Sequence, residues 1–230
     1  MSKSAPISVT PRPLGAVRTV GTFAATAVLL ALAACTGREG RSVDELVLDD
    51  GRYLEPETMR PYSGLAFATF NDQPSVVAQR LSLRDGAYHG PFEAYFDNRK
   101  LIAREYYENG VRHGAYRWYF EDGELFEEGT FENGLREGPY RAYWDTGDLY
   151  EEGTYRNGDF DGPRRWYKDG RMIEEVTYQD GVLHGLYERY REDGSVDLKG
   201  VLEQGEPCGI WFEAERTIRH PACGAPSVTE

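Results

Sequence analysis

The first 34 residues contain no aspartate or glutamate, although the 230-residue chain holds 39 acidic residues. The apolar run that ends this segment, residues 20–34, is shorter than the roughly 20 residues that a membrane-spanning helix requires. Basic residues followed by a short apolar run are typical of a secretory signal peptide, and here the basic residues are Lys3, Arg12 and Arg18. We therefore expect residues 1–34 to form a signal helix that is absent from the mature protein.

The apolar run ends in Leu32-Ala33-Ala34-Cys35, which resembles the lipobox of bacterial lipoproteins. This resemblance implies that Cys35 is acylated and becomes the mature N terminus, with residues 35–43 as a tether; an uncleaved signal anchor is the alternative. The next residue is Thr36 and not the aspartate that typically retains lipoproteins in the inner membrane. The resemblance thus implies an outer-membrane lipoprotein that faces the periplasm and contacts the membrane through lipid only.

Cysteine is scarce, with three residues in the chain. Once Cys35 is assigned to lipid, Cys208 and Cys223 remain, and an oxidising compartment allows them to form a disulfide. The sequence alone leaves open whether they are bonded.

Basic residues are also under-represented, and the chain has a formal net charge of −13. Removal of the leader with its three basic residues would leave 23 basic and 39 acidic residues, a net charge of −16. This charge argues against binding to nucleic acid or to anionic lipid surfaces. It suits a cationic protein partner, although an acidic, solvated surface that maintains solubility is the simpler interpretation.

Glycine recurs with a period of 24 residues, once 23. It closes five units at Gly114, Gly138, Gly162, Gly185 and Gly209. Such a period indicates stacked repeats, each of which buries its apolar face against its neighbours. We expect one domain over residues 44–224, followed by a tail at 225–230. Its units are a degenerate one at 65–90, clear ones at 91–114, 115–138, 139–162, 163–185 and 186–209, and a partial one at 210–224.

Each unit contains two stretches of alternating residues that are separated by turn signals. The second stretch ends in a dipeptide that favours a type I′ hairpin turn. These dipeptides are Asp85-Gly86, Asn109-Gly110, Asn133-Gly134, Asn157-Gly158 and Asp180-Gly181. The sequence therefore predicts an all-β fold, an elongated antiparallel meander of stacked β-hairpins.

The strand register can be predicted from charge. A four-residue loop at 121–124 would place Phe120 opposite Leu125 and Trp118 opposite Glu127. The same register brings opposite charges together in all five units, at Glu93 and Arg104, Arg117 and Glu128, Arg141 and Glu152, Arg165 and Glu175, and Glu188 and Lys199. It also places a tyrosine over each strand glycine, in the pairs Tyr116 and Gly129, Tyr140 and Gly153, and Tyr187 and Gly200.

This register gives the sheet two different faces. One face is expected to be the better buried, and it would carry Phe96, Phe120, Trp144, Leu101, Leu125, Leu149, Phe131 and Tyr155. The other would carry the charge pairs and a tyrosine column of Tyr95, Tyr119, Tyr143, Tyr167 and Tyr190. The column is the candidate binding face, since its rings could stack on sugars or receive an extended segment. The alternatives are rings that merely fill the sheet face, and strand addition at a sheet edge.

Catalysis and metal binding are not expected. The couples Glu127-Glu128, Glu151-Glu152 and Glu174-Glu175 form an acidic ladder, and paired carboxylates are what a glycosidase needs. One glutamate of each couple is matched to a basic residue, however, and we expect the ladder to be open to water.

Three histidines precede closing glycines, at His89, His113 and His184. Adjacent units lie ~10 Å apart, too far for one zinc ion, so we expect no metal and no cofactor.

The recurring pattern NG-x(3)-G-x(3)-WY-x(3)-DG-x-L-x-EGTY resembles the MORN-type repeat, in the variant common in the bacterial YwqK-like family, over residues 44–212. Members of that family are often labelled antitoxins, whereas MORN arrays elsewhere serve as scaffolds and membrane-associated spacers. The resemblance implies a membrane-anchored, non-catalytic protein-interaction module. An antitoxin or immunity protein that captures a cationic toxin and a carbohydrate-contacting envelope protein are the alternatives. Open sheet edges also allow self-association.

Overall fold

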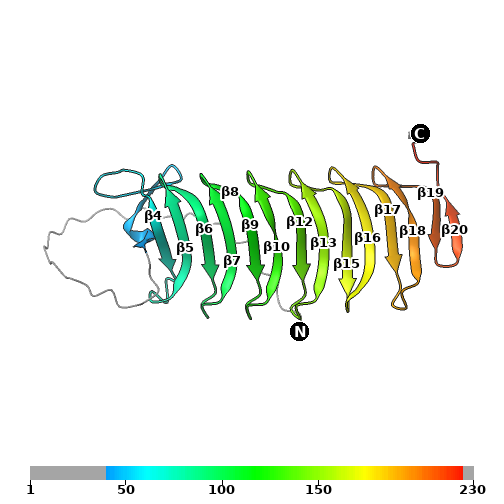
Figure 1. Ribbon diagram of the computed structural model, residues 1–230, viewed down its shortest axis with the longest axis horizontal. Helices are drawn as coiled ribbons and strands as arrows, with labels where there is room; N and C mark the ends of the chain where they lie inside the picture. Colours follow the sequence, from blue (N-terminus) through cyan, green and yellow to red (C-terminus); the bar gives the residue numbers. More distant parts are fainter. Residues whose placement is uncertain (1–39, 225–230) are drawn as a thin grey trace.

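The computed structural model describes residues 40–224, which form a single row of β-hairpins along the longest axis of the molecule (Figure 1). Eighteen of the described strands belong to one sheet, and two more form a small hairpin beside it. The predicted all-β, elongated hairpin array is confirmed. The expected signal helix at 1–34, Cys35 and the tail at 225–230 lie outside the described residues.

The long strands form the hairpins and the short ones flank them. The N-terminal elements are β1 (Arg41–Ser42), the 3-10 helix η1 (Val43–Glu45), β2 (Val47–Asp49) and β3 (Arg52–Leu54). The hairpin strands are β4 (Gly64–Thr69), β5 (Val77–Arg84), β6 (Ala87–Tyr95), β7 (Leu101–Glu108), β9 (Gly114–Tyr119), β10 (Leu125–Glu132), β12 (Gly138–Tyr143), β13 (Leu149–Arg156), β15 (Gly162–Lys168), β16 (Arg171–Gln179), β17 (Val182–Tyr190), β18 (Val196–Glu203), β19 (Glu206–Glu213) and β20 (Arg216–Arg219). Two-residue strands follow three of the turns: β8 (Val111–Arg112), β11 (Leu135–Arg136) and β14 (Asp159–Phe160).

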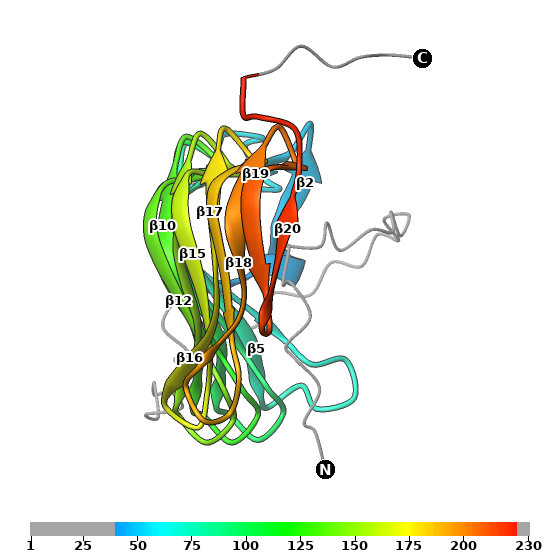
Figure 2. The same cartoon turned by 90° about the vertical axis from the view of Figure 1, so that its right-hand side faces the viewer.

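Successive long strands from β4 to β20 pair antiparallel, so chain order is also spatial order. The exception is β1, which runs parallel to β4 and places Arg41 beside Ala66. Residues 41–43 of the expected tether therefore lie in the folded domain, and Val43 is buried. Figure 2 shows the row almost end-on, with β19 and β20 at the near end.

The turn dipeptides adopt the predicted conformation, as at Asn133 and Gly134 with φ of 50° and 86°. Both angles are positive, which a type I′ turn requires. These turns are also bonded to the short strand that follows the turn before them: the Gly134 N–H donates to the Arg112 carbonyl at 2.8 Å, and the Gly158 N–H donates to the Arg136 carbonyl at 2.9 Å. The turns therefore stack at the same 24-residue period as the strands.

All five predicted charge pairs are confirmed as directly opposed residues. The loop next to them was predicted wrongly, because Leu125 lies opposite Tyr119 and not opposite Phe120. The Phe120 N–H donates to the Glu124 carbonyl at 2.9 Å, so Phe120 lies opposite Glu124. The loop is therefore residues 121–123, one residue shorter than the expected 121–124. Phe126 then forms a one-residue bulge between Leu125 and Glu127, and the two shifts cancel from Trp118 onward.

The bulge also corrects the predicted faces. We call the side that carries Tyr116 and Tyr140 the inner face, and the side that carries the charge pairs the outer face. The leucines expected on the inner face lie opposite outer-face tyrosines, in the pairs Leu101 and Tyr95, Leu125 and Tyr119, and Leu149 and Tyr143. Because an extra residue reverses the alternation of side chains, these leucines belong to the outer face. Trp144, also expected to be buried, is 42% exposed.

The inner face is covered by its own aromatic rings, which contact one another along the sheet. Tyr116 is 1% exposed and lies 4.8 Å from Phe131 between ring centroids. Its ring covers Gly129, where an added Cβ would come within 2.8 Å of the ring. Gly200 lies opposite Tyr187 as predicted, and the ring nearest to it is that of Trp211, since an added Cβ would lie 2.1 Å from Trp211. The partial last unit thus supplies the larger ring.

Candidate functional site

The five charge pairs form a row along the outer face from β6 to β18, which we call the charge row. The nitrogen–oxygen distances are 2.7 Å for Arg104 and Glu93, 3.1 Å for Arg117 and Glu128, and 3.6 Å for Arg141 and Glu152, and closer contacts join Arg165 to Glu175 and Lys199 to Glu188. The arginines at Arg117 and Arg141 are more than half exposed. Such exposed pairs contribute ~0–1 kcal/mol each, so the row fixes strand register more than it stabilises the fold.

The tyrosine column runs beside this row and is tied to it. All five tyrosines are half-buried. The hydroxyl of Tyr143 donates to Glu128 at 3.2 Å and that of Tyr167 to Glu152 at 2.8 Å, and Tyr95 and Tyr190 donate to the glutamates two residues before them. The rings are therefore held at fixed positions, one in each unit.

The phenol groups of Tyr95 and Tyr167 stay protonated near neutral pH. Burial, followed by the hydrogen bond to Glu152, raises the pKa of Tyr167 to about 12. Burial and the hydrogen bond to Glu93 raise the pKa of Tyr95 to about 12. These tyrosines consequently present neutral rings and have no role as general bases.

A second set of carboxylates lies on the inner face, where we had expected solvent. Glu105, Glu127 and Glu151 are 0%, 8% and 6% exposed. Adjacent strand residues point to opposite faces, so in each couple one glutamate is on the outer face and its neighbour is inside. The prediction of an acidic ladder open to water is therefore wrong for Glu127 and Glu151.

Each buried glutamate has an arginine partner. Glu105 accepts from the Arg112 Nε at 2.8 Å, Glu127 lies 2.7 Å from an Arg136 nitrogen, and Glu151 contacts Arg164. Glu105 also accepts from the Tyr107 hydroxyl at 2.8 Å and from the Trp118 indole at 2.9 Å. The Tyr116 hydroxyl donates to Glu127 at 2.7 Å, and the Arg136 guanidinium lies 5.3 Å from the Trp118 ring.

Burial raises the pKa of Glu127, while Arg136 and Tyr116 act in the opposite direction. A raised carboxyl pKa is typical of a general acid. Here, however, the carboxylate is engaged by an arginine and a phenol and enclosed by rings, so this arrangement leaves no room for a substrate atom. Strand alternation was the signal that could have identified this network from the sequence, because consecutive glutamates in one strand cannot share a face.

The three histidines that precede closing glycines have different surroundings. The His89 Nδ1 accepts from the Asn109 N–H at 3.4 Å, His113 lies 4.0 Å from Glu108, and the His184 Nδ1 is buried without a hydrogen-bond partner among the described residues. Over residues 40–224 the group that could hold a metal is Glu203, Cys208 and Cys223. The two cysteines form a disulfide with Cα atoms 5.0 Å apart, so their sulfurs are not available as thiolates.

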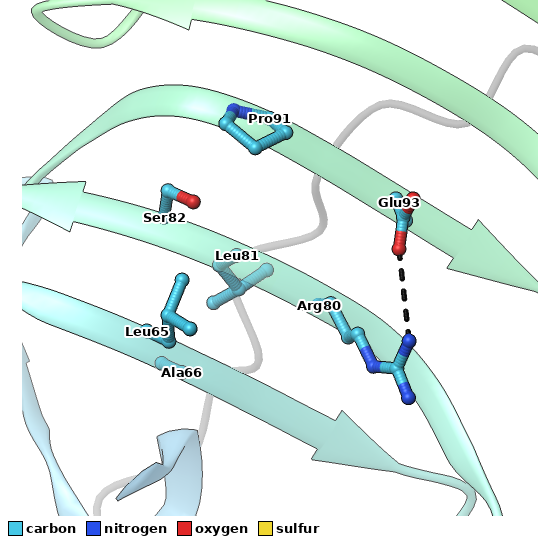
Figure 3. A pocket seen from close by; sticks show the side chains of 7 residues that line it. All are labelled: Leu65, Ala66, Arg80, Leu81, Ser82, Pro91 and Glu93. Atoms are coloured by element: carbon cyan, nitrogen blue, oxygen red, sulfur yellow. Dashed lines mark ion pairs between the residues drawn. The ribbon is translucent and has the colours of Figure 1, made fainter. Parts of the chain in front are cut away.

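A shallow hollow of about 330 Å³ opens over β4, β5 and β6 at the N-terminal end of the sheet (Figure 3). Leu65, Leu81 and Pro91 line one part of it, and the side chains of Arg80 and Glu93, 3.8 Å apart, line another. These two charges form an ion pair at one end of the hollow. It therefore presents a mixed apolar and ion-paired lining, without a matched pair of free carboxylates.

The pH dependence of stability should report on the charge row. Hydrogen bonds from Lys199 and Tyr190 lower the pKa of Glu188 below its ordinary value of 4.5. A carboxyl group with a lowered pKa stabilises the fold above pH 4.5, and this contribution is lost as the pH falls through the lowered pKa. We expect the melting temperature to fall less between pH 6 and pH 3 in Glu188→Gln than in the parent protein. Glu192→Gln, at a side chain that is 98% exposed, is the control, and identical curves for all three proteins would contradict this assignment.

Over the described residues no helix has the length and apolar character needed to cross a membrane. A search among curated proteins finds no match to this chain. Residues 112–133 and 136–157 match the family model of the MORN repeat variant. MORN repeats are generally non-catalytic modules of protein and membrane interaction. The stacked hairpins over residues 112–157 are therefore similar to MORN-type repeats.

Proposed function

We propose that this protein is a non-catalytic protein-interaction module that a lipid on Cys35 holds at the outer membrane, facing the periplasm. The acid-free leader and the lipobox-like Leu32-Ala33-Ala34-Cys35 support the anchor. The repeat match supports the interaction role. The buried glutamates are neutralised by arginines inside the sheet, which supports a structural role for them and not a catalytic one.

The outer face is the proposed contact surface, and the observation that carries this choice is the tyrosine column. Four of its five hydroxyls are bonded to glutamates of the charge row, so the rings are ordered before any partner arrives. Ordered rings lose little conformational entropy on binding and offer large apolar areas. A partner can thus contact several units at once along the row.

The anchor can be tested separately from the binding surface. The parent protein should sediment with membranes and incorporate labelled palmitate in its host, and Cys35→Ser should do neither. Equal behaviour of the two proteins would remove the lipid anchor from the proposal.

The binding surface is tested by in-cell crosslinking followed by affinity capture and mass spectrometry. Tyr143→Ala with Tyr167→Ala should lose the protein that the parent captures. Tyr150→Ala is the matched control, because Tyr150 lies in the same repeat but contacts Trp144 instead of the charge row. Retention of the captured protein by the column variant would contradict the outer-face assignment, and capture of glycan fragments in place of protein would favour a carbohydrate-contacting role.

A cationic partner, as in toxin capture, is the second candidate. Two neighbouring hairpin turns, residues 121–124 and 145–148, carry five carboxylates, at Glu121, Asp122, Glu124, Asp145 and Asp148. Binding led by these charges should weaken steeply as salt rises, because exposed charges are screened over about 8 Å at physiological ionic strength. Binding by the tyrosine column should change little.

A further inference from the structure

The last hairpin, β19–β20, departs from the repeat on its outer face. In the five clear units, the third residue after the glycine that precedes the unit is charged: Glu93, Arg117, Arg141, Arg165 and Glu188. In the last hairpin this position is Phe212, and the residue opposite it is Thr217 where the earlier units have the second member of the ion pair. Both charges of the pair have therefore been replaced, one by a large apolar side chain and the other by a small one.

The inner face of the same hairpin keeps the repeat pattern. Trp211 stands at the position of Tyr116 and Tyr140, is 7% exposed, and covers Gly200 of the preceding strand. Its indole N–H lies 3.1 Å from the carbonyl oxygens of Val201 and Cys208. The inner face of the last hairpin thus keeps the packing of the earlier units, and the difference is confined to its outer face.

Phe212 belongs to an exposed apolar group that we call the C-terminal patch. Phe212, Ile210 and Val201 are 53%, 49% and 40% exposed and lie on the neighbouring strands β18 and β19. Together they expose roughly 250 Å² of apolar surface, taking about 150–200 Å² for a whole side chain. A stable dimer buries about 800 Å² on each partner, so the patch by itself suits a single segment better than a second copy.

The patch lies beside an open sheet edge. Among the described strands β20 pairs only with β19, so its other side presents unpaired backbone N–H and C=O groups. Thr217 lies on β20 between this edge and Phe212. Because its side chain is short, a long side chain from an added strand could extend over it and contact Phe212. Arg219 is exposed on the same edge, and no ion pair joins it to another residue in the range 40–224.

We infer that β20 and the C-terminal patch form a strand-addition site for an extended segment of a partner protein, which alternates apolar and polar residues and carries a carboxylate opposite Arg219. Backbone hydrogen bonds to β20 would supply the pairing, and long apolar side chains that cross Thr217 onto Phe212 would supply selectivity. Arg219 is a basic group at the edge of a chain with a net charge of −13, which favours an acidic residue in the incoming strand. This inference rests on the proposed interaction function and places the docking site at the C-terminal end of the sheet.

The test uses the mature chain with Cys35→Ser and a displayed library of random ten-residue peptides. The decisive variant is Phe212→Arg with Thr217→Glu, which restores the ion pair that Arg117 and Glu128 form elsewhere and should therefore fold. We expect enriched peptides that alternate apolar and polar residues, contain Asp or Glu, and bind this variant at least about 10-fold more weakly than the parent. Arg219→Glu should weaken binding as well, and hydrogen exchange at β20 should slow when peptide is bound.

A second pair of substitutions separates the edge from the patch. Arg117→Phe with Glu128→Thr creates the same apolar group on β9 and β10, which are paired on both sides, and we expect no new peptide binding there. Equal peptide binding by the parent and the Phe212→Arg, Thr217→Glu variant would overturn the site. So would a dimer, seen by sedimentation, that the same variant abolishes, because the occupant would then be a second copy.

In-cell capture distinguishes the failure of this inference from the failure of the proposed function. If the tyrosine column variant loses the captured protein while Phe212→Arg, Thr217→Glu keeps it, the strand-addition site is contradicted and the interaction function stands. If neither variant loses it, both the function proposed for the outer face and the strand-addition site are contradicted.

Discussion

Glu105→Ala should lower the melting temperature by about 10 °C, the largest effect that we expect from a single substitution. Removing one partner of a buried ion pair costs about 3–5 kcal/mol, and each kcal/mol shifts the midpoint by about 2–4 °C in a domain of this size. Glu105 is fully buried, and its Arg112 partner has a side chain that is 19% exposed. The substitution removes the carboxylate that Arg112 contacts and leaves the Tyr107 hydroxyl and the Trp118 indole without the acceptor they share.

Thermal unfolding at pH 7, followed by circular dichroism, measures this effect. Glu128→Ala is the matched control: its carboxylate accepts from Arg117, whose side chain is 58% exposed, and we expect a loss below about 1 kcal/mol. Glu105→Leu with Arg112→Leu should recover most of the stability, since no buried charge is then left unpaired. Equal melting temperatures for Glu105→Ala and Glu128→Ala would show that the inner ion pairs are not the source of stability.

Cys223→Ser should release the C-terminal end of the sheet and raise amide hydrogen exchange in β19 and β20 by about 100-fold. The disulfide from Cys208 to Cys223 closes a loop of 15 residues, which corresponds to about 3 kcal/mol, and each 1.4 kcal/mol is a tenfold change in an equilibrium. Without the disulfide, residues 220 and 221 are held by two backbone hydrogen bonds. The His220 N–H donates to the Gly209 carbonyl at 2.8 Å, and the Gly209 N–H donates to the Pro221 carbonyl at 2.7 Å. Cys223 is exposed, so serine at this position creates no buried hole.

Hydrogen exchange read strand by strand is the appropriate measurement, because each repeat contacts only its neighbours and the loss should stay near the end. Strands β9 and β10 serve as the internal control and should exchange as in the parent. Reduction of the parent protein with dithiothreitol should reproduce the effect of Cys223→Ser. Unchanged protection of β19 and β20 in the variant would mean that the disulfide adds nothing to the stability of the last hairpin.

The strand pairing could be predicted because it depends on signals close together in the sequence. Asn-Gly and Asp-Gly turns fix where each hairpin reverses, and opposite charges such as Arg117 and Glu128 fix which residues face each other. The error in the adjacent loop did not spread, because the shorter turn and the bulge at Phe126 each shift the register by one residue in opposite directions. The same bulge did reverse the predicted face of Leu125.

The repeat period, the hairpins and the register of the charge pairs could all be predicted from the sequence, since each depends on residues that lie close together in the chain. Which groups are buried depends on how the strands stack. Glu127 and Glu128 are identical neighbours, yet one is enclosed with Arg136 and the other faces solvent with Arg117. The arginine that neutralises Glu127 follows the next turn, and the rings that enclose it come from several strands. A carboxylate becomes buried only when those distant strands stack together. Its pKa and its contribution to the free energy of unfolding depend on that burial.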